Sequence, residues 1–543
     1  MAATHRADVV IAGGGLAGLA TAHELLDRGL RVLILDRDTE DKLGGLAKRS
    51  FGGVMFVDTP QQRKLGLKDT PELAWSDWQS FADFGDDDEW PRRWAKTYVG
   101  GSRELIFDWF TDRGVDFLPV VNWAERGLFK PGNSVPRWHI AWGTGFAIIE
   151  AVVASLEEHA HRDKLTILFG HRVEHLLIEG GRIVGCSGSL EDGGGEFEVR
   201  ADHVVLASGG ICGGDLRMVK ANWYEPWGTP PATLLNGSHR FADGLLHDEA
   251  AKHGAVLTHL DKQWHYAAGV HSREADSPGD GISLVPPRSA LWLDARGRRF
   301  GPVPLMGYSD TRWVVEQICR TPWQYSWQVL NWKIAIKELA VSGCDYMTAF
   351  RNKRKLQLVR EVLFGNKDLA NRLIEESEDF VVADTLPELI DKMDELSLEG
   401  ATLDRDGMMA DIQAYDDQIG RGPRYFNDEQ LRRIANFRQY KADRLRTCAF
   451  RQIDDAKARP LIAIREFILS RKSLGGLKTD LSSRVLDTTG EPVPGLYAVG
   501  ETAGFGGGGI HGMGSLEGTF LGSCVLTGRL CGRAVGGESG GFR

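Results

Sequence analysis

The feature that most constrains this chain is a glycine-rich turn between two apolar runs near its start. Residues 7–13 read ADVVIAG, which is typical of a buried parallel strand. The pattern G-x-G-x-x-G follows, with its glycines at Gly13, Gly15 and Gly18, and residues 19–26 begin an amphipathic helix. A second apolar run, residues 31–35, ends on Asp36. This order of strand, turn, helix, strand and acidic residue predicts a dinucleotide-binding βαβ unit.

Each part of this unit has a chemical reason. Glycines allow the backbone to approach a pyrophosphate, and the N-terminus of the helix faces its negative charge. The carboxylate of Asp36 can accept hydrogen bonds from ribose hydroxyls. The alternative interpretation is an ordinary tight turn between a strand and a helix. The flanking apolar runs and the spacing to Asp36 favour the nucleotide site.

The composition bounds the class of protein. A chain of 543 residues is too long for one compact core, so we expect two domains or one interrupted domain. A hydrophobic content of 42% and a charged content of 26% are ordinary for a globular enzyme. The net charge of −10 gives no electrostatic support to a nucleic-acid partner.

The cysteines and the apolar stretches bear on the compartment. Seven cysteines are scattered without C-x-x-C spacing, which indicates reduced thiols and neither a disulfide framework nor a zinc site. The first strand begins close to Met1, so we expect no signal peptide. No apolar stretch reaches the roughly 18 residues of a membrane span. These features predict a cytoplasmic enzyme without a bound metal.

Further turns and strands extend the first predicted domain. The glycine-rich residues 44–53 form a loop that can wrap the phosphates of a cofactor. Four short strands between residues 165 and 199 predict an antiparallel meander, and residues 203–207 predict another parallel strand. Near the end, residues 495–500 predict a closing strand, and a helix is expected from about Leu516.

The central part of the chain has a different residue composition. Residues 261–455 contain a proline-rich stretch and long charged helical segments, which predicts an inserted domain. The expected fold class is α/β: a Rossmann-like domain of residues 1–260 and 456–543 carries a mainly helical α+β cap or substrate domain. All sixteen tryptophans lie between Trp75 and Trp332. They indicate either large helix packing or an aromatic cavity for a bulky apolar substrate.

Six segments, taken as a set, resemble a known family. They are GGGLAGL (13–19), GGLAKRSFGG (44–53), VVLASGG (204–210), ADG (242–244), SLGGLKTD (473–480) and PGLYAVGE (494–501). The set resembles the FAD-dependent fumarate reductase/succinate dehydrogenase flavoprotein superfamily, and within it the 3-ketosteroid dehydrogenase-like branch. The resemblance implies FAD as the cofactor and hydride exchange between flavin N5 and a substrate carbon beneath the cap.

The resemblance also implies roles for individual residues. The first glycine motif would hold the pyrophosphate, Asp36 the adenosine ribose, and Glu501 ribityl or ribose hydroxyls. Ser50 and its neighbours would contact the phosphates or the flavin edge, and the backbone at 514–516 would face the flavin pyrimidine. The implied cofactor-binding residues are Gly13, Gly15, Gly18, Asp36, Gly44, Gly45, Ser50, Gly52, Gly53, Val173, Ala207, Ser208, Gly209, Asp243, Gly475, Gly500, Glu501, Gly514, Ser515 and Leu516.

Two departures from the family's dicarboxylate enzymes bear on the substrate. Those enzymes carry an HHTMGG-like stretch where this chain has RKSLGG at 471–476. They also carry a substrate-binding arginine at the last position of an H-G-A-N-R segment. The corresponding residues 511–515 of this chain read HGMGS, so Ser515 replaces the arginine. A serine cannot replace the bidentate clamp that arginine provides for a carboxylate. Fumarate and succinate are therefore not the expected substrates.

Three residues of the insert are candidates for proton chemistry. Tyr308 lies where ketosteroid dehydrogenases have a catalytic tyrosine, and Arg312 lies near the proton-donating arginine of fumarate reductases. His265 falls near a substrate histidine of the superfamily. Dehydrogenation needs a base for one proton, and reduction needs an acid. Each residue has a structural alternative, such as a buried phenol or an ion-paired arginine.

The resulting hypothesis is an FAD-dependent oxidoreductase that acts on a carbon next to a ketone or enone in a bulky apolar, possibly steroid-like substrate. One alternative is a reductase of a smaller α,β-unsaturated acid. Another is a flavin electron-transfer protein that works with a separate partner. The expected partners are a small apolar substrate and an unidentified electron acceptor or donor, without nucleic acid or membrane span. An oligomer is compatible with the sequence.

Overall fold

The computed structural model describes residues 3–275, 277, 279–307 and 309–538. The chain divides into two compact units. The first unit comprises residues 1–223, 238–264 and 472–543, and the second comprises residues 224–237 and 265–471. The short segment 224–237 thus belongs with the insert, although it precedes the return of the chain to the first unit.

The first unit is built on a mainly parallel sheet. Its strands are β1 (Ala3–Ala12), β2 (Val32–Leu35), β5 (Leu165–Leu168), β6 (His171–Glu179), β7 (Arg182–Leu190), β8 (Glu196–Leu206), β19 (Arg484–Leu486) and β20 (Pro492–Ala498). The order is β19-β20-β8-β1-β2-β5, with β7 also on β8 and β6 on β7. Small pairs are formed by β3 (Gly53–Met55) with β4 (Trp138–Ile140), and by β10 (Leu257–Thr258) with β18 (Gly476–Leu477).

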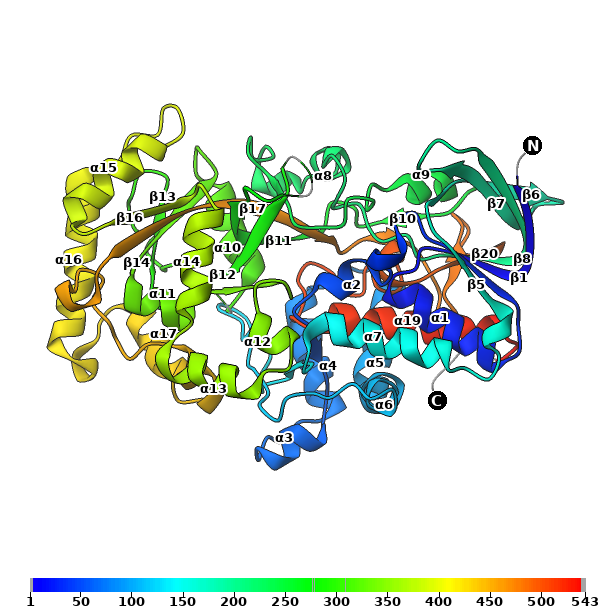
Figure 1. Ribbon diagram of the computed structural model, residues 1–543, viewed down its shortest axis with the longest axis horizontal. Coiled ribbons are helices and arrows are strands. Elements are labelled where there is room, and N and C mark those ends of the chain that lie inside the picture. The colour runs from blue at the N-terminus through cyan, green and yellow to red at the C-terminus, as the bar shows by residue number, and fades with distance from the viewer. Residues whose placement is uncertain (1–2, 276, 278, 308, 539–543) are drawn as a thin grey trace. The chain divides into compact units, whose positions relative to one another are not determined.

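The first unit also contains eleven helices within the described residues. They are α1 (Leu16–Asp27), α2 (Gly45–Arg49), α3 (Pro60–Lys64), α4 (Pro71–Ala82), α5 (Glu89–Gly101), the π-helical η2 (Ser102–Phe107), α6 (Asp108–Asp112), α7 (Thr144–Glu157), α8 (Arg217–Ala221), α9 (Leu245–Lys252) and α19 (Thr519–Val535). Short 3-10 turns are η1 (Glu40–Lys42), η3 (Arg162–Lys164) and η7 (Gly500–Thr502). Helices α1 and α19, from opposite ends of the sequence, lie side by side (Figure 1).

The alternation of side chains along β1 explains how both faces of the sheet are buried. Val10 and Ala12 contribute to a core that also contains residues of β6 and α9. Ile11 points to the other face, because a Cβ added to Gly18 of α1 would lie 3.3 Å from its Cγ2. Such apolar residues on both faces are typical of parallel sheets covered by helices.

Three details of this unit differ from the sequence-based expectation. β5 is a parallel edge strand paired with β2, so it is not part of the antiparallel meander. The two expected strands near 196–199 and 203–207 are one continuous strand, β8, because its first half pairs with β7 and its second half with β20. The last helix begins at Thr519, after Gly518 in a left-handed conformation, and not near Leu516.

The second unit is α+β, with a larger sheet than its sequence indicated. Its strands are β9 (Leu235–Asn236), β11 (Gln263–His271), β12 (Gly281–Val285), β13 (Leu291–Asp294), β14 (Tyr325–Asn331), β15 (Ala340–Val341), β16 (Phe380–Ala383) and β17 (Leu461–Ser473). The order is β13-β14-β17-β11-β12-β15, with β9 and β16 also on β17. β11 and β17 each cross the boundary between the units by two residues.

Helices form the rest of the second unit. They are α10 (Thr311–Cys319), α11 (Trp332–Glu338), α12 (Thr348–Arg351), α13 (Lys355–Phe364), α14 (Lys367–Glu376), α15 (Leu386–Leu396), α16 (Arg405–Arg421), α17 (Glu429–Phe437) and α18 (Lys441–Arg446), with 3-10 turns η4 (Glu225–Trp227), η5 (Pro423–Tyr425) and η6 (Ala456–Ala458). Many apolar residues of these helices pack with β14 and β17 in one core. Among the helices of the described ranges, none is long and apolar enough to cross a membrane.

Several tryptophans serve as core residues. Trp78, Trp94, Trp264, Trp292 and Trp327 are among the largest fully buried side chains. Burial of this kind favours the packing interpretation for these five. The seven cysteines, all within the described residues, are unbridged, and all but Cys524 are buried.

Candidate functional site

The glycine turn after β1 brings three segments into close contact. Gly13 has φ +116°, and a Cβ at this position would lie 2.3 Å from the carbonyl oxygen of Ala207. A Cβ at Gly18 would lie 2.1 Å from the carbonyl oxygen of Gly13. Gly15 caps α1 in an extended conformation, with open space where its Cβ would be. The turn is therefore tightly packed at Gly13 and Gly18 and open at Gly15, which suits the approach of a phosphate to the start of α1.

Asp36 holds the turn from the end of β2. Its Oδ2 accepts the amide of Gly14 at 2.7 Å, and its Oδ1 accepts the amide of Asp38 at 2.7 Å. Each carboxylate oxygen has a second lone pair, so both can still accept hydrogen bonds from ribose hydroxyls. The residue therefore positions the glycine turn and presents acceptors beside it.

The second glycine loop packs against the first. The amide of Gly44 donates to the carbonyl of Gly14 at 3.0 Å, and Gly44 has φ +103°. Farther along, the hydroxyl of Ser50 donates to the carbonyl of Ala47 at 2.7 Å and accepts the amide of Gly52 at 3.3 Å. The Ser50 hydroxyl thus shapes the loop from within.

These segments enclose a cavity with about 1120 Å³ of atom-free space, open solvent included. Its lining contains twelve of the residues named from the sequence: Gly13, Gly15, Asp36, Gly44, Gly45, Val173, Ala207, Ser208, Gly209, Asp243, Gly500 and Glu501. The other eight lie outside this lining: Gly18, Ser50, Gly52, Gly53, Gly475, Gly514, Ser515 and Leu516. Gly18 lies in α1, Gly53 begins β3, and the other six belong to loops.

The sequence analysis did not predict one wall of the cavity. The Arg37 guanidinium lies 4.1 Å from the ring centre of Phe241 and donates to Asp243 at 2.7 Å and to Glu191. Asp38 accepts from Arg240 at 2.6 Å. Burial alone would raise the pKa of Asp38, but hydrogen bonds from His239, the Thr39 amide and Arg240 hold it well below its usual range. In the sequence, the only indication that Arg37 and Asp38 line the cavity was their position directly after Asp36.

The segments near the end of the chain form a second group in the same unit. Ser473 donates its amide to Oε1 of Glu501 at 2.8 Å, so residues 473 and 501 are in contact. A Cβ at Gly475 would lie 2.1 Å from the carbonyl oxygen of His259. Glu501 therefore joins the nucleotide cavity to the SLGGLKTD segment.

The loop before α19 surrounds a buried histidine. His511 is stacked on Trp78, with ring centres 5.8 Å apart, and its Nε2 lies 2.8 Å from Oγ1 of Thr519. Burial, and then the nearby charge of Lys472, hold the pKa of His511 well below its usual range. The Ser515 hydroxyl contacts Thr519 at 2.9 Å. At the position that the resemblance aligns with the arginine of the dicarboxylate enzymes, the Ser515 hydroxyl is therefore hydrogen-bonded to Thr519.

Two of the three proton-transfer candidates are neighbours in the second unit. The Arg312 guanidinium lies 4.5 Å from the ring centres of both Tyr224 and Trp227. The ring of His265 lies 6.2 Å from that of Trp227. Tyr308 lies outside the described residues. Sequence reasoning missed Tyr224 and Trp227, because about 85 residues separate them from Arg312.

Electrostatics distinguishes these two candidates. Burial, and then the charge of Arg312, lower the pKa of His265 to about 3. His265 is therefore neutral at physiological pH and is a poor proton acceptor. Burial also lowers the pKa of Arg312, while a hydrogen bond with Tyr224 opposes that shift. Arg312 is thus a partly desolvated donor framed by aromatic rings.

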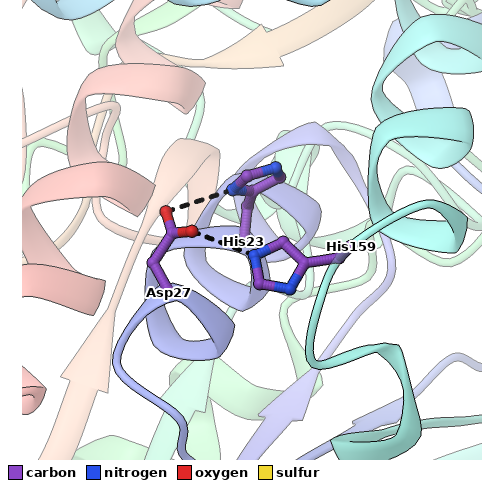
Figure 2. A group of neighbouring side chains, drawn as sticks. All are labelled: His23, Asp27 and His159. Carbon is purple, nitrogen blue, oxygen red and sulfur yellow. Dashed lines mark hydrogen bonds and ion pairs between the residues drawn. The ribbon is translucent and has the colours of Figure 1, made fainter.

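A different cluster has ligand types suited to a metal. His23 and Asp27 are one turn apart on α1, and His159 follows α7 (Figure 2). Nε2 of His159 lies 2.9 Å from Asp27, and Nδ1 of His23 lies 3.5 Å from it. However, Nδ1 of His159 accepts the amide of His161 at 3.0 Å, which places the proton on Nε2. Arg113 lies 3.0 Å from both ring nitrogens of His23. These donors use the lone pairs that a metal would need, so we infer a hydrogen-bonded network.

We therefore expect that neither removal nor addition of metal ions changes the stability of this protein. Dialysis against a chelator, or addition of Zn²⁺, should not alter the thermal midpoint of unfolding, since ligands stabilise only when they bind the folded state. The measurement is a thermal scan with and without metal. A zinc-dependent rise in the wild type that His23→Gln lacks would contradict this expectation.

The fold and the cavity define a dinucleotide-binding protein with a parallel sheet and a glycine turn at the start of a helix. The residues present fit FAD. The glycines at 13 and 44 allow the segments around the cavity to pack closely, and Gly15 leaves open space at the start of α1. Asp36 and Glu501 present acceptors to hydroxyl groups. The amides of the first turn of α1 have no partners inside the helix and suit a pyrophosphate.

The chain belongs to the FAD binding domain family FAD_binding_2, whose model matches residues 8–521. It is an FAD-dependent oxidoreductase. It is 42% identical over 550 residues to a KsdD-like steroid dehydrogenase of Mycobacterium tuberculosis, covering 97% of this chain and 95% of the relative.

Two solved structures share the fold. One is 3-ketosteroid Δ1-dehydrogenase from Sterolibacterium denitrificans, with TM-score 0.70 and 16% identity over 98% of this chain and 99% of that one. The other is 3-ketosteroid-Δ4-(5α)-dehydrogenase from Rhodococcus jostii, with TM-score 0.65 and 22% identity over 98% and 97%. The expected membership of this flavoprotein superfamily is confirmed.

Proposed function

We propose that this protein is an FAD-dependent dehydrogenase that acts on a CH–CH bond next to a ketone in a bulky, steroid-like substrate. The observation that carries the proposal is the 42% identity, over almost the full length of both chains, to a KsdD-like steroid dehydrogenase. The engagement of Ser515 at the position of the dicarboxylate-binding arginine supports an uncharged substrate.

The proposed chemistry requires the loss of a hydride from one carbon and of a proton from its neighbour, and the role of base for that proton is assigned to Tyr308, as the resemblance implies. When bound, FAD supplies the two-electron acceptor for the hydride. We assign Arg312 the role of hydrogen-bond donor to the ketone oxygen, because a donor there makes the neighbouring C–H more acidic. The guanidinium packs against the rings of Tyr224 and Trp227. His265, with a pKa of about 3, is assigned a neutral polar role near this group.

The cofactor residues are proposed to act as the resemblance implies. The twelve residues that line the cavity would hold the adenosine and pyrophosphate portion of FAD. Of the residues outside it, Gly18 would support the turn that holds the pyrophosphate. The others would contact the remainder of FAD: Ser50, Gly52, Gly53, Gly475, Gly514, Ser515 and Leu516. Arg37, Asp38 and Phe241 are added to the first group because they form one wall of the same cavity.

The test is reduction of the bound flavin by substrate. The purified holoenzyme is mixed anaerobically with a panel of 3-ketosteroids, and flavin absorbance is followed with and without an artificial electron acceptor. We expect bleaching without the acceptor and turnover with it. If no steroid bleaches the flavin but an unsaturated acid reoxidises the reduced enzyme, the reductase alternative replaces this proposal.

Arg312→Lys tests the assigned donor. Lysine keeps the charge but loses the planar guanidinium that packs against the two rings, so we expect kcat with a reactive ketosteroid to fall by about 100-fold or more. FAD content should be unchanged, because the cavity assigned to the cofactor is lined by residues of the first unit.

A matched control is Arg320→Lys, at the end of the same helix. Arg320 is exposed and pairs with Glu316, so kcat should change little. Wild-type kcat in Arg312→Lys would remove Arg312 from the proposed chemistry.

A further inference from the structure

Helix α13 belongs to the second unit and is labelled in Figure 1. It presents an unusual number of apolar side chains to solvent. Leu356, Val359, Leu363 and Phe364 are 89%, 56%, 67% and 72% exposed. They are four of the nine large hydrophobic residues that are exposed among the described residues. None of the ten residues of α13 is buried. Single exposed apolar residues are ordinary, but such a cluster marks a contact surface.

The exposed side chains share one face of the helix. At about 100° per residue, the four fall within an arc of about 140°. Contacts with α11 hold the helix in place: Lys337 of α11 donates to the carbonyl of Val362 at 2.8 Å. A Cβ at Gly365, just after the helix, would lie 2.7 Å from Ile336 of α11. The orientation that exposes this face is therefore fixed by packing on α11.

Basic residues precede and follow α13 in the sequence, and two lie within it. Within residues 351–367 the cations are Arg351, Lys353, Arg354, Lys355, Arg360 and Lys367. The one acidic residue there is Glu361, which accepts a hydrogen bond from Gln357 at 2.7 Å. Arg360 lies within the apolar arc, where its long side chain can keep its charge in water while its methylenes stay in contact with apolar surface. This concentration of positive charge contrasts with the net charge of −10 for the whole chain.

We propose that α13 is an interfacial helix that lies on an anionic lipid surface, with its apolar face in the headgroup region. An exposed apolar face flanked by cations is the combination that such surfaces bind. A second copy of this chain is a poorer occupant, because pairing the same face would bring the two basic clusters together. The inference is independent of the proposed substrate.

The experiment is cosedimentation of the FAD-loaded protein with vesicles. The probes are vesicles of equal parts phosphatidylcholine and phosphatidylglycerol, and vesicles of phosphatidylcholine alone. We expect binding to the mixed vesicles that weakens with added salt, and binding at least tenfold weaker to phosphatidylcholine alone. The double variant Leu363→Glu with Phe364→Glu should weaken binding to the mixed vesicles at least tenfold.

The matched control replaces two exposed apolar residues of the first unit, Leu65→Glu with Phe129→Glu, which adds the same charge elsewhere. This control should bind like the wild type, and both variants should keep their FAD and thermal midpoint. Failure of the wild type to bind the mixed vesicles would overturn the proposal. Equal binding of the wild type and the α13 variant would also overturn it. A dimer in sedimentation equilibrium that only the α13 variant dissociates, without vesicle binding, would assign this face to a second copy.

Discussion

Gly13→Ala is expected to lower the FAD content of the purified protein about tenfold or more. The residue has φ +116°, a conformation that costs a non-glycine residue about 1–3 kcal/mol. Its Cβ would also lie 2.3 Å from the carbonyl oxygen of Ala207, so β1 and the segment after β8 must separate. Since 1.4 kcal/mol corresponds to about a tenfold change in affinity, this strain is sufficient. The measurement is the ratio of flavin to protein absorbance.

Gly114→Ala is the matched control for this variant. Gly114 has φ +79° but open space around the position of a Cβ. It therefore reproduces backbone strain in the same unit without the close approach to a neighbouring segment. Gly18→Ala complements it, because Gly18 is crowded by the Gly13 carbonyl without a positive φ. Full flavin content in Gly13→Ala would show that this turn does not hold the cofactor.

Arg137→Met should give the largest loss of stability. Arg137 is fully buried and donates to Asp69 at 2.8 Å and to Asp77 at 2.6 Å, and both carboxylates are buried. Removal of the cation leaves two buried carboxylates without their charge partner, which costs about 3–5 kcal/mol. The thermal midpoint of unfolding, followed by the release of flavin fluorescence, should fall accordingly.

Two further variants separate charge from packing. Arg63→Met removes an exposed cation that pairs with Asp58, and should change the thermal midpoint little, because solvent screens an exposed ion pair. The triple variant Arg137→Met, Asp69→Leu and Asp77→Leu should recover part of the loss, because no unpaired charge remains. If Arg137→Met unfolds like Arg63→Met, the buried network contributes nothing to stability.

Local patterns predicted the first βαβ unit well. The order of strand, glycine turn, helix and acidic residue is a property of adjacent residues, and β1, α1 and β2 form where it indicated. The family and the cofactor followed from segments that are each short and continuous. The strand pairing was less predictable. β5 has the same apolar texture in a parallel or an antiparallel pair, and only its neighbour β2 decided between them.

The amino-acid sequence by itself determined the dinucleotide-binding unit and, through its set of motifs, FAD, because those patterns act over a few residues of backbone. The tertiary structure alone placed Phe241 beside Arg37, Glu501 beside Ser473, and Arg312 against Tyr224 and Trp227. It also decided that the apolar face of α13 is exposed, since that helix has the composition of an ordinary packed one. Such contacts join residues that are tens to hundreds of positions apart. They depend on which faces the folded chain buries, and no local pattern encodes that choice.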